Sequence, residues 1–239
     1  MKYLELTFAD PARNLACDEA LLDLFEMEHI DDGLLRLWQP QNFFVVLGHS
    51  NRLRAEANIP ACLAGGIPIL RRVSGGGAVL QGPGCLNYSL FLDGTAHDVR
   101  NIEAGFRYVL ERHRQFIGAL TSDDIRIDDN SDLTIAGRKF SGNAQYRKSR
   151  YVLVHGTFLL RFDLSMIDRC LHLPAKQPKY RENRPHLDFV ANLDVEPNRI
   201  RSGLRDSWRA TDTFDAIPLN QVERLVDMRY GLEAWSRKF

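Results

Sequence analysis

The sequence lacks the features that would place the protein in a membrane or outside the cell. No stretch approaches the roughly 18 uninterrupted apolar residues that a membrane-spanning helix needs. The first six residues include the charged side chains Lys2 and Glu5, where a signal peptide would continue into an apolar run. We therefore expect a cytoplasmic protein with no membrane partner.

An excess of charge of either sign is also missing. The chain carries 31 Lys and Arg side chains against 31 Asp and Glu side chains, so its formal net charge is zero. Without a global positive field, bulk electrostatic attraction to a nucleic-acid backbone is weak. We expect no nucleic-acid partner.

Cysteine is scarce, and its four positions are far apart: Cys17, Cys62, Cys85 and Cys170. No two of them form a C-x-x-C pair, and they make no disulfide-dense framework. Because free cysteine is among the most frequently buried residue types, we interpret these as reduced and mostly buried thiols.

What remains is an ordinary globular composition, with 44% hydrophobic and 26% charged residues in 239. This length suits one large α/β domain or two small ones. Apolar runs predict strands at 2–8, 33–38, 43–48, 67–72, 84–92, 124–128, 132–136, 138–146 and 151–160. Helical spacing predicts helices from an Asn14 cap to about Glu28, from an Asn101 cap to about 119, and at 164–171, 197–210 and 218–229. Many strands with few helices between them favour an α+β fold, with a mixed central sheet flanked by helices.

Three consecutive glycines form the first segment that points to chemistry, in Arg71-Arg72-Val73-Ser74-Gly75-Gly76-Gly77-Ala78-Val79. Glycine loses more backbone entropy on folding than any other residue, so such a run indicates a close approach of the backbone to something. Successive N–H groups can bind an anion, and two arginines add donors suited to phosphate or carboxylate. The spacing fits neither a Walker loop nor a dinucleotide fingerprint. The alternative is a plain hairpin turn with solvated arginines.

A lysine flanked by glycines forms the second segment, Gly137-Arg138-Lys139-Phe140-Ser141-Gly142-Asn143-Ala144-Gln145. Strand alternation would place Lys139, Ser141 and Asn143 on one face and Arg138, Phe140 and Gly142 on the other. A lysine fixed on a sheet offers positive charge to a substrate oxyanion or phosphate. The alternative is a surface lysine in a hairpin.

The third segment is Val154-His155-Gly156-Thr157, inside an otherwise apolar strand. A lone histidine in a strand is more often a hydrogen-bonded core residue than a catalyst. The glycine after it leaves space in which a ligand or another backbone can pack.

Together these segments resemble the lipoate–protein ligase A family, whose superfamily includes biotin–protein ligases and octanoyltransferases. The family pattern is Arg-Arg-x-Ser/Thr-Gly-Gly-Gly-x-Val, Asn-Asp-Leu, Gly-Arg/Lys-Lys-x-Ser-Gly-x-Ala and His-Gly-Thr-Leu-Leu. It matches 71–79, Ser131-Asp132-Leu133, 137–144 and 155–159. Segments 14–20, 35–38 and 46–51, with Glu56 and Asn58, also agree, so the likeness runs from about residue 10 to 195.

The resemblance implies one catalytic domain over residues 1–239, with the fold of the biotin/lipoate ligase superfamily. It implies that the glycine loop, with Arg71 and Arg72, binds the acyl carboxylate and the phosphate of an acyl-adenylate. Lys139 would contact the acyl carbonyl and α-phosphate, and Asp132 would bind Mg²⁺. The remaining implied substrate-binding residues line the acyl tunnel or the loop: Ser74, Gly75, Gly76, Gly77, Ala78, Gly142, Ala144, His155, Gly156 and Thr157.

The implied chemistry has two steps. ATP first converts the poorly electrophilic carboxylate of lipoate into lipoyl-AMP, and fixed positive charge lowers the cost of the anionic transition state. The ε-amine of a lysine on an acceptor lipoyl domain then attacks the carbonyl. The partner is therefore a lipoyl-domain protein.

Three departures from the pattern leave other routes open. The glycine loop is followed by Gln81-Gly82-Pro83-Gly84-Cys85 where many ligases have His-Asp-x-Gly-Asn, and Ser131 replaces an asparagine. The chain also ends at Phe239, so we expect no C-terminal accessory domain of the kind that many ligases carry. It would then need a separate accessory protein, use a preformed acyl-adenylate, or transfer acyl groups from a carrier protein.

The transfer route in this superfamily uses a cysteine nucleophile. One octanoyltransferase type has it shortly before the Gly-Lys-Lys segment, but residues 122–136 contain no cysteine. The other type has it after a proline where this chain has Pro174-Ala175, and neither Cys85 nor Cys170 aligns. Binding of lipoyl domains without turnover is a further alternative. We interpret Arg181 to His186 as a solvated surface loop.

Overall fold

The computed structural model describes residues 1–239, except for the side chain of His97. Eight strands form the main sheet in the order β11-β1-β2-β6-β10-β9-β8-β7. β1 runs parallel to β2 and β11, whereas the other neighbours are antiparallel, so the sheet is mixed as predicted. The strands are β1 (Lys2–Glu5), β2 (Leu34–Trp38), β6 (Cys85–Asp93), β7 (Ile125–Asp128), β8 (Asp132–Ile135), β9 (Arg138–Arg147), β10 (Tyr151–Leu159) and β11 (Asp212–Thr213).

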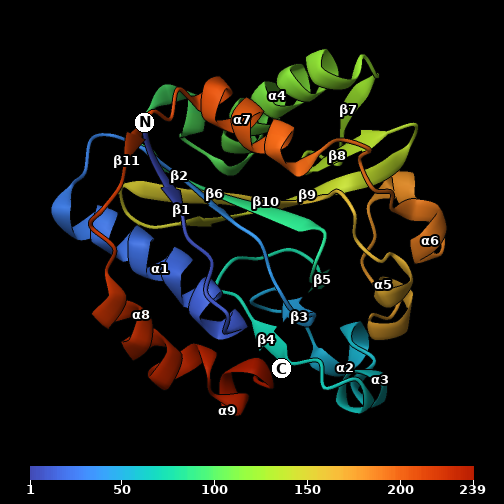
Figure 1. Ribbon diagram of the computed structural model, residues 1–239. Helices are drawn as coiled ribbons and strands as arrows, with labels where there is room; N and C mark the ends of the chain where they lie inside the picture. The colour runs from blue at the N-terminus through green and yellow to red at the C-terminus, as the bar shows by residue number, and fades with distance from the viewer.

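Helices cover both faces of this sheet (Figure 1). The long helices α4 (Ile102–Thr121) and α7 (Pro197–Trp208) lie on one face, and α1 (Pro11–Glu28) and α8 (Leu219–Leu225) lie on the other. Each face buries an apolar cluster. The cluster on the α4 side includes Tyr88 and Phe158, and the cluster on the α1 side includes Phe25 and Phe91. In the part of the chain that the structure describes, no helix is long and apolar enough to cross a membrane.

A small second sheet lies on the α1 side and has the order β4-β3-β5. Its strands are β3 (Phe44–Leu47), β4 (Ile69–Arg71) and β5 (Val79–Gln81), so the glycine loop connects β4 to β5. Short elements surround it: α2 (Leu53–Glu56), α3 (Ile59–Ala64), α5 (Ser165–Cys170), α6 (His186–Phe189) and α9 (Glu233–Ser236). Short turns of 3-10 or π helix occupy His97–Val99, Lys179–Arg181 and Val226–Tyr230.

The two predicted helix caps have different outcomes. Asn101 caps α4, because its side chain accepts a hydrogen bond from Ala104 N at 2.8 Å. Asn14 is not a cap: α1 begins three residues earlier, at Pro11, with Asp10 as its N-cap. The Asp10-Pro11 pair is the better start signal, since proline at the first helical position has no N–H to satisfy. Asn14 instead accepts from Phe8 N at 3.0 Å.

A β-bulge overturns the predicted alternation along β9. Thr134 pairs with Lys139 and Leu133 pairs with Ser141, so Phe140 is an extra residue without a partner. The bulge moves Lys139 to the face that carries Gly142, and the prediction that Lys139 shares a face with Ser141 and Asn143 is wrong. Phe140 fills the core beneath α4 and α7.

A buried ion pair fixes α1 to the main sheet. Arg36 of β2 is fully buried and donates to Asp18 Oδ1 of α1 at 2.6 Å. It also donates to the carbonyl oxygens of Asn14, at 2.9 Å, and Leu6, at 3.1 Å. The other carboxylate oxygen of Asp18 accepts from Ser89 of β6 at 2.8 Å. One carboxylate therefore links a helix to two neighbouring strands.

We expect Asp18→Ala to lower the free energy of unfolding by about 3–5 kcal/mol, because it leaves the guanidinium of Arg36 buried without a counter-charge. Urea unfolding of the purified variant measures the loss. The matched control is Asp124→Ala, which removes an exposed pair with Arg126 and should cost about 0–1 kcal/mol. Equal losses in the two variants would contradict the assigned role of the Asp18–Arg36 pair.

Candidate functional site

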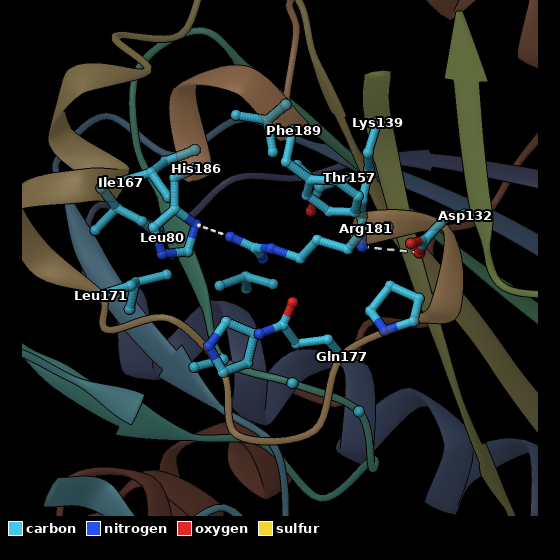
Figure 2. A pocket seen from close by; sticks show the side chains of 18 of the residues that line it. Leu80, Asp132, Lys139, Thr157, Ile167, Leu171, Gln177, Arg181, His186 and Phe189 are labelled. Atoms are coloured by element: carbon cyan, nitrogen blue, oxygen red, sulfur yellow. Dashed lines mark hydrogen bonds and ion pairs between the residues drawn. The ribbon is translucent and has the colours of Figure 1, made fainter. Parts of the chain in front are cut away.

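Two adjoining cavities lie where the glycine loop meets β8, β9 and β10. The larger has a volume of about 470 Å³ and the smaller about 160 Å³. The smaller one continues between apolar side chains that include Leu15, Trp38 and Val46. Both are lined by Asp132, Lys139, Gly142, Thr157 and residues 76–79. Figure 2 shows the larger cavity, with Lys139 and Asp132 at one side. The shared residues therefore mark the junction of the two compartments.

Arg72 organises the glycine loop from inside. It is buried, and its Nη2 donates to the carbonyl oxygens of Gly75 at 2.7 Å and Gly77 at 2.9 Å. Gly76 has φ +92°, a conformation that favours glycine. Among the described residues, no acceptor receives the N–H groups of Gly75, Gly76 and Gly77. The loop thus offers free backbone donors at the rim of the cavities, an arrangement that suits an anion.

Arg71 has a different environment from Arg72. It is fully buried and lines neither cavity. Its Nη1 donates to the carbonyl oxygens of Gly48 and Asn51, both at 2.8 Å. Its Nε and Nη2 donate to those of Trp235, at 3.1 Å, and Ser236, at 2.9 Å. Arg71 therefore ties the C-terminal segment to the loop 48–51, and a substrate contact would require these bonds to break.

Lys139 is held by Asp132 across the bulge. Its Nζ lies 2.7 Å from Asp132 Oδ1, and Asp132 is 4% exposed. The other oxygen of Asp132 accepts a 2.7 Å hydrogen bond from the hydroxyl of Tyr180. Burial raises the pKa of Tyr180, and the negative charge of nearby Asp132 raises it further, so this hydroxyl keeps its proton and donates. A β-carbon at Gly142 would lie 2.8 Å from Lys139 Nζ, so a larger residue there would require the end of the lysine side chain to shift.

His155 lies behind the glycine loop. Its Nε2 is 2.7 Å from Ser74 Oγ, and its Nδ1 is 4.0 Å from Asp18 Oδ2. Burial lowers the pKa of His155 to about 4, so the ring is neutral at pH 7. With Ala144, His155 lines the smaller cavity. The pair of Ser74 and His155 joins the loop to β10.

Gly156 allows close packing behind the smaller cavity, and Thr157 takes part in a hydrogen-bond network in its wall. A β-carbon at Gly156 would lie 1.8 Å from Asn143 Oδ1 and 2.8 Å from the ring of Tyr88, so only glycine fits. Thr157 accepts from Gln81 Nε2 at 2.7 Å, and Gln81 in turn accepts from Asn87 at 2.9 Å. This polar network closes the wall between β5, β6 and β10. It includes Gln81, for which the sequence indicated no role.

The segment 171–190 supplies a wall of the larger cavity that the sequence did not predict. The interpretation of Arg181 to His186 as a solvated loop holds for Glu182, Asn183 and Pro185, which are exposed. It is wrong for Arg181 and His186, which are 4% and 6% exposed and line the cavity. The segment folds back because Arg138 donates to Val190 O at 2.6 Å and Ala191 N donates to Lys139 O at 2.9 Å. Proline and charge in this segment resemble those of an exposed loop, and no local pattern reveals the burial.

The four cysteines are buried, and none lines either cavity. Burial raises the pKa of Cys85 and Cys62 to about 12 and that of Cys17 to about 11. The pKa of Cys170 is also raised by burial. The prediction of buried thiols is confirmed, and no thiolate is available at the site.

A cluster of three or more His, Cys, Asp or Glu side chains able to hold a metal is absent from the described residues. Mg²⁺ needs no such cluster when phosphate oxygens of a substrate complete its coordination, because one or two carboxylates then suffice. Asp132 is a carboxylate at the junction of the cavities and fits that donor set.

Comparisons with known proteins agree with this geometry. Residues 10–202 match the family model described as the lipoyl protein ligase A/B catalytic domain. The chain belongs to this family. It is 30% identical over 211 residues to a protein of Aeropyrum pernix named "Putative lipoate-protein ligase A", covering 87% of this chain and 74% of that one. It spans about half the length of its Mycoplasma relatives.

Other similar proteins are named as a ligase subunit or as an octanoyltransferase. Lipoate-protein ligase A subunit 1 of Thermoplasma acidophilum is 23% identical, with 93% of this chain and 90% of that one covered. The octanoyltransferase LipM of Brevibacillus brevis is also 23% identical, with 98% of each covered. A crystal structure of a lipoate-protein ligase A bound with ATP superposes with a TM-score of 0.85, at 23% identity and with 99% and 98% coverage. The predicted family and fold are thereby confirmed.

The buried histidine should make this protein sensitive to acid. Because the folded-state pKa of His155 lies below its ordinary value of 6.5, the unfolded chain takes up the proton first. Stability is therefore full above pH 6.5 and falls toward pH 4. We expect His155→Gln to flatten this fall, as measured by the midpoint of thermal unfolding between pH 7 and pH 4.5. The exposed His29→Asn serves as control, and identical slopes in all three proteins would refute the prediction.

Proposed function

We propose that this protein activates lipoate with ATP as lipoyl-AMP and transfers the lipoyl group to a lysine of an acceptor lipoyl domain. The observation that carries the proposal is the position of Lys139, whose amine lies at the junction of two cavities, the smaller of which extends between Leu15, Trp38 and Val46. An acyl chain suits the space between these three side chains, which we call the acyl compartment, and a nucleotide suits the larger cavity. The carboxylate and the α-phosphate would then meet beside Lys139.

In this arrangement the chain's own residues act through fixed charge and position. Lys139 stabilises the negative charge that develops when the carboxylate approaches the phosphate. The free N–H groups of Gly75, Gly76 and Gly77 hold the acyl carboxylate or the phosphate, and Arg72 keeps the loop in shape. Ser74, Ala78, Gly142, Ala144, His155, Gly156 and Thr157 complete the proposed substrate-binding set. Arg71 contributes through the loop 48–51.

Asp132 would hold Mg²⁺ together with phosphate oxygens of ATP. The metal would supply charge neutralisation for the phosphates. In the structure, the two oxygens of this carboxylate contact Lys139 and Tyr180.

The second step moves the acyl group to the partner protein. The ε-amine of the acceptor lysine attacks the carbonyl carbon of lipoyl-AMP, the amide bond forms, and AMP leaves with the electrons of the broken bond. The amine loses a proton to solvent. The glycine loop lies at the rim of both cavities, where such a lysine would enter.

Two alternative functions are suggested by relatives that are named as a ligase subunit and as an octanoyltransferase. The likeness to a ligase subunit from Thermoplasma acidophilum favours a chain that needs a separate accessory protein for adenylation. The likeness to octanoyltransferase LipM favours transfer from a carrier protein without ATP. The buried cysteines count against the second alternative, because that mechanism needs a reactive thiolate.

One mass-spectrometric assay on an acceptor lipoyl domain separates these functions. Purified protein receives lipoate with Mg-ATP, octanoyl-acyl carrier protein without ATP, or synthetic lipoyl-AMP. A mass gain with lipoate and ATP supports the complete ligase. A gain with lipoyl-AMP alone supports the split ligase, whereas a gain with the carrier alone would contradict the ligase proposal.

We expect Lys139→Ala to lower transfer at least a hundredfold, because the anionic transition state loses its fixed positive charge. Circular dichroism and thermal unfolding check that the fold is retained. The matched control is Lys148→Ala, which also breaks a lysine–aspartate pair, with Asp23, but lies outside both cavities. If Lys139→Ala transfers the acyl group as fast as this control, the assigned role of Lys139 is wrong.

Replacing cysteine should leave the ligase reaction intact. Cys85→Ser and Cys170→Ser remove thiols that line neither cavity and carry raised pKa values. Both variants should retain transfer from lipoyl-AMP and lack a thioester adduct on incubation with octanoyl carrier. If one substitution instead stops turnover and removes an adduct that the unchanged protein forms, the transferase function applies.

A further inference from the structure

Arg181 is a buried cation without a counter-charge. It is 4% exposed, and no carboxylate of the described residues pairs with it. Its Nε donates to Arg184 O at 3.1 Å, and its Nη2 lies 3.2 Å from His186 Nδ1. The guanidinium also stacks 4.5 Å above the ring of Phe189. These contacts orient the group but supply no negative charge.

The other buried guanidinium groups near the site have more hydrogen-bond partners than Arg181. Arg36 has the carboxylate of Asp18, and Arg71 and Arg72 are surrounded by carbonyl oxygens. The Nη1 of Arg181 has no hydrogen-bond partner among the described residues. A buried charge left unpaired is costly, and groups perturbed by burial cluster at functional sites. The burial also lowers the pKa of Arg181.

His186 fixes the direction in which Arg181 points. The guanidinium can only donate, so His186 Nδ1 accepts its hydrogen bond. The proton of the ring then lies on Nε2, which donates to His172 O at 3.2 Å. His186 is therefore held neutral between its two partners. Figure 2 shows the guanidinium of Arg181 directed at His186 across the larger cavity.

Arg181 lines only the larger cavity, whereas Lys139 and Asp132 line both. The next step rests on the proposed function, in which the carboxylate of lipoate approaches the α-phosphorus from the smaller cavity. Displacement at phosphorus places the attacking and leaving oxygens roughly in line. The leaving group must therefore point away from the acyl compartment, into the space that Arg181 occupies.

We propose that Arg181 binds the β- and γ-phosphates of ATP and the pyrophosphate that departs from it. In the step it serves, a carboxylate oxygen forms a bond to the α-phosphorus. The bond from that phosphorus to the oxygen bridging to the β-phosphate breaks, and pyrophosphate leaves with the electron pair. No proton is transferred. Arg181 stabilises the charge that gathers on the leaving group, and its planar fork suits two phosphate oxygens.

Isothermal titration of the full chain with pyrophosphate, ATP and AMP, each with Mg²⁺, tests this assignment. Arg181→Gln should weaken pyrophosphate and ATP binding about ten- to hundredfold, since a hydrogen bond to a charged group is lost. AMP binding should change by less than about threefold. Arg181→Lys, which keeps the charge but not the fork, should restore part of the loss. The control Lys179→Gln removes an exposed charge from the same turn, outside both cavities.

A second readout compares the two half-reactions in the same variant. Arg181→Gln should slow lipoylation from lipoate and ATP at least tenfold more than lipoylation from synthetic lipoyl-AMP, because only the first route produces pyrophosphate. Thermal unfolding checks the fold of each variant.

Two results would overturn the assignment. Equal losses for AMP, ATP and pyrophosphate would make Arg181 a general support of the cavity. Unchanged binding, or an unaltered protein that binds neither ATP nor pyrophosphate, would also refute it. In the last case, transfer from lipoyl-AMP would show that the proposed acyl transfer stands even though this inference fails.

Discussion

Arg36 and Asp18 form an ion pair in the interior, and much of the site depends on it. Asp18 lies on α1, Arg36 on β2, and Ser89, which donates to Asp18, on β6. The same carboxylate lies 4.0 Å from Nδ1 of His155 on β10. His155 in turn contacts Ser74 of the glycine loop. The carboxylate of Asp18, which holds α1 on the sheet, therefore also lies behind the loop that lines both cavities. The same buried charge contributes to the fold and to the shape of the site.

A second constraint is the extra residue in β9. Without the bulge at Phe140, strand alternation would point Lys139 into the core beneath α4 and α7. The bulge turns it toward Asp132, and Gly142 leaves room for its side chain. Bulges often redirect a side chain beside a functional site, and here the redirected group is the cation at the junction of the two cavities.

The charges around the cavities fall into three states. Lys139 is neutralised by Asp132, Arg72 is saturated by the carbonyl oxygens of the loop, and Arg181 has no anionic partner among the described residues. Under the proposed function, Lys139 and Arg181 are the two cations that meet the phosphates of the substrate. Two such cations suit a polyphosphate better than a neutral thioester, and the burial of the thiols away from the cavities agrees with this proposal.

Local patterns along the chain were enough to predict the family, the mixed α+β sheet and the segments that meet at the site, because glycine runs, strand patterns and the order of motifs are local features. They also predicted the cap of α4 at Asn101. The face that Lys139 occupies could not be predicted in this way, because a bulge depends on the register between two strands. The difference between Arg71, which holds the C-terminal segment, and Arg72, which holds the loop, likewise follows from the folded arrangement. The fold also places Tyr180 against Asp132 and Arg181 in the larger cavity, because these positions follow from long-range contacts that no local pattern contains.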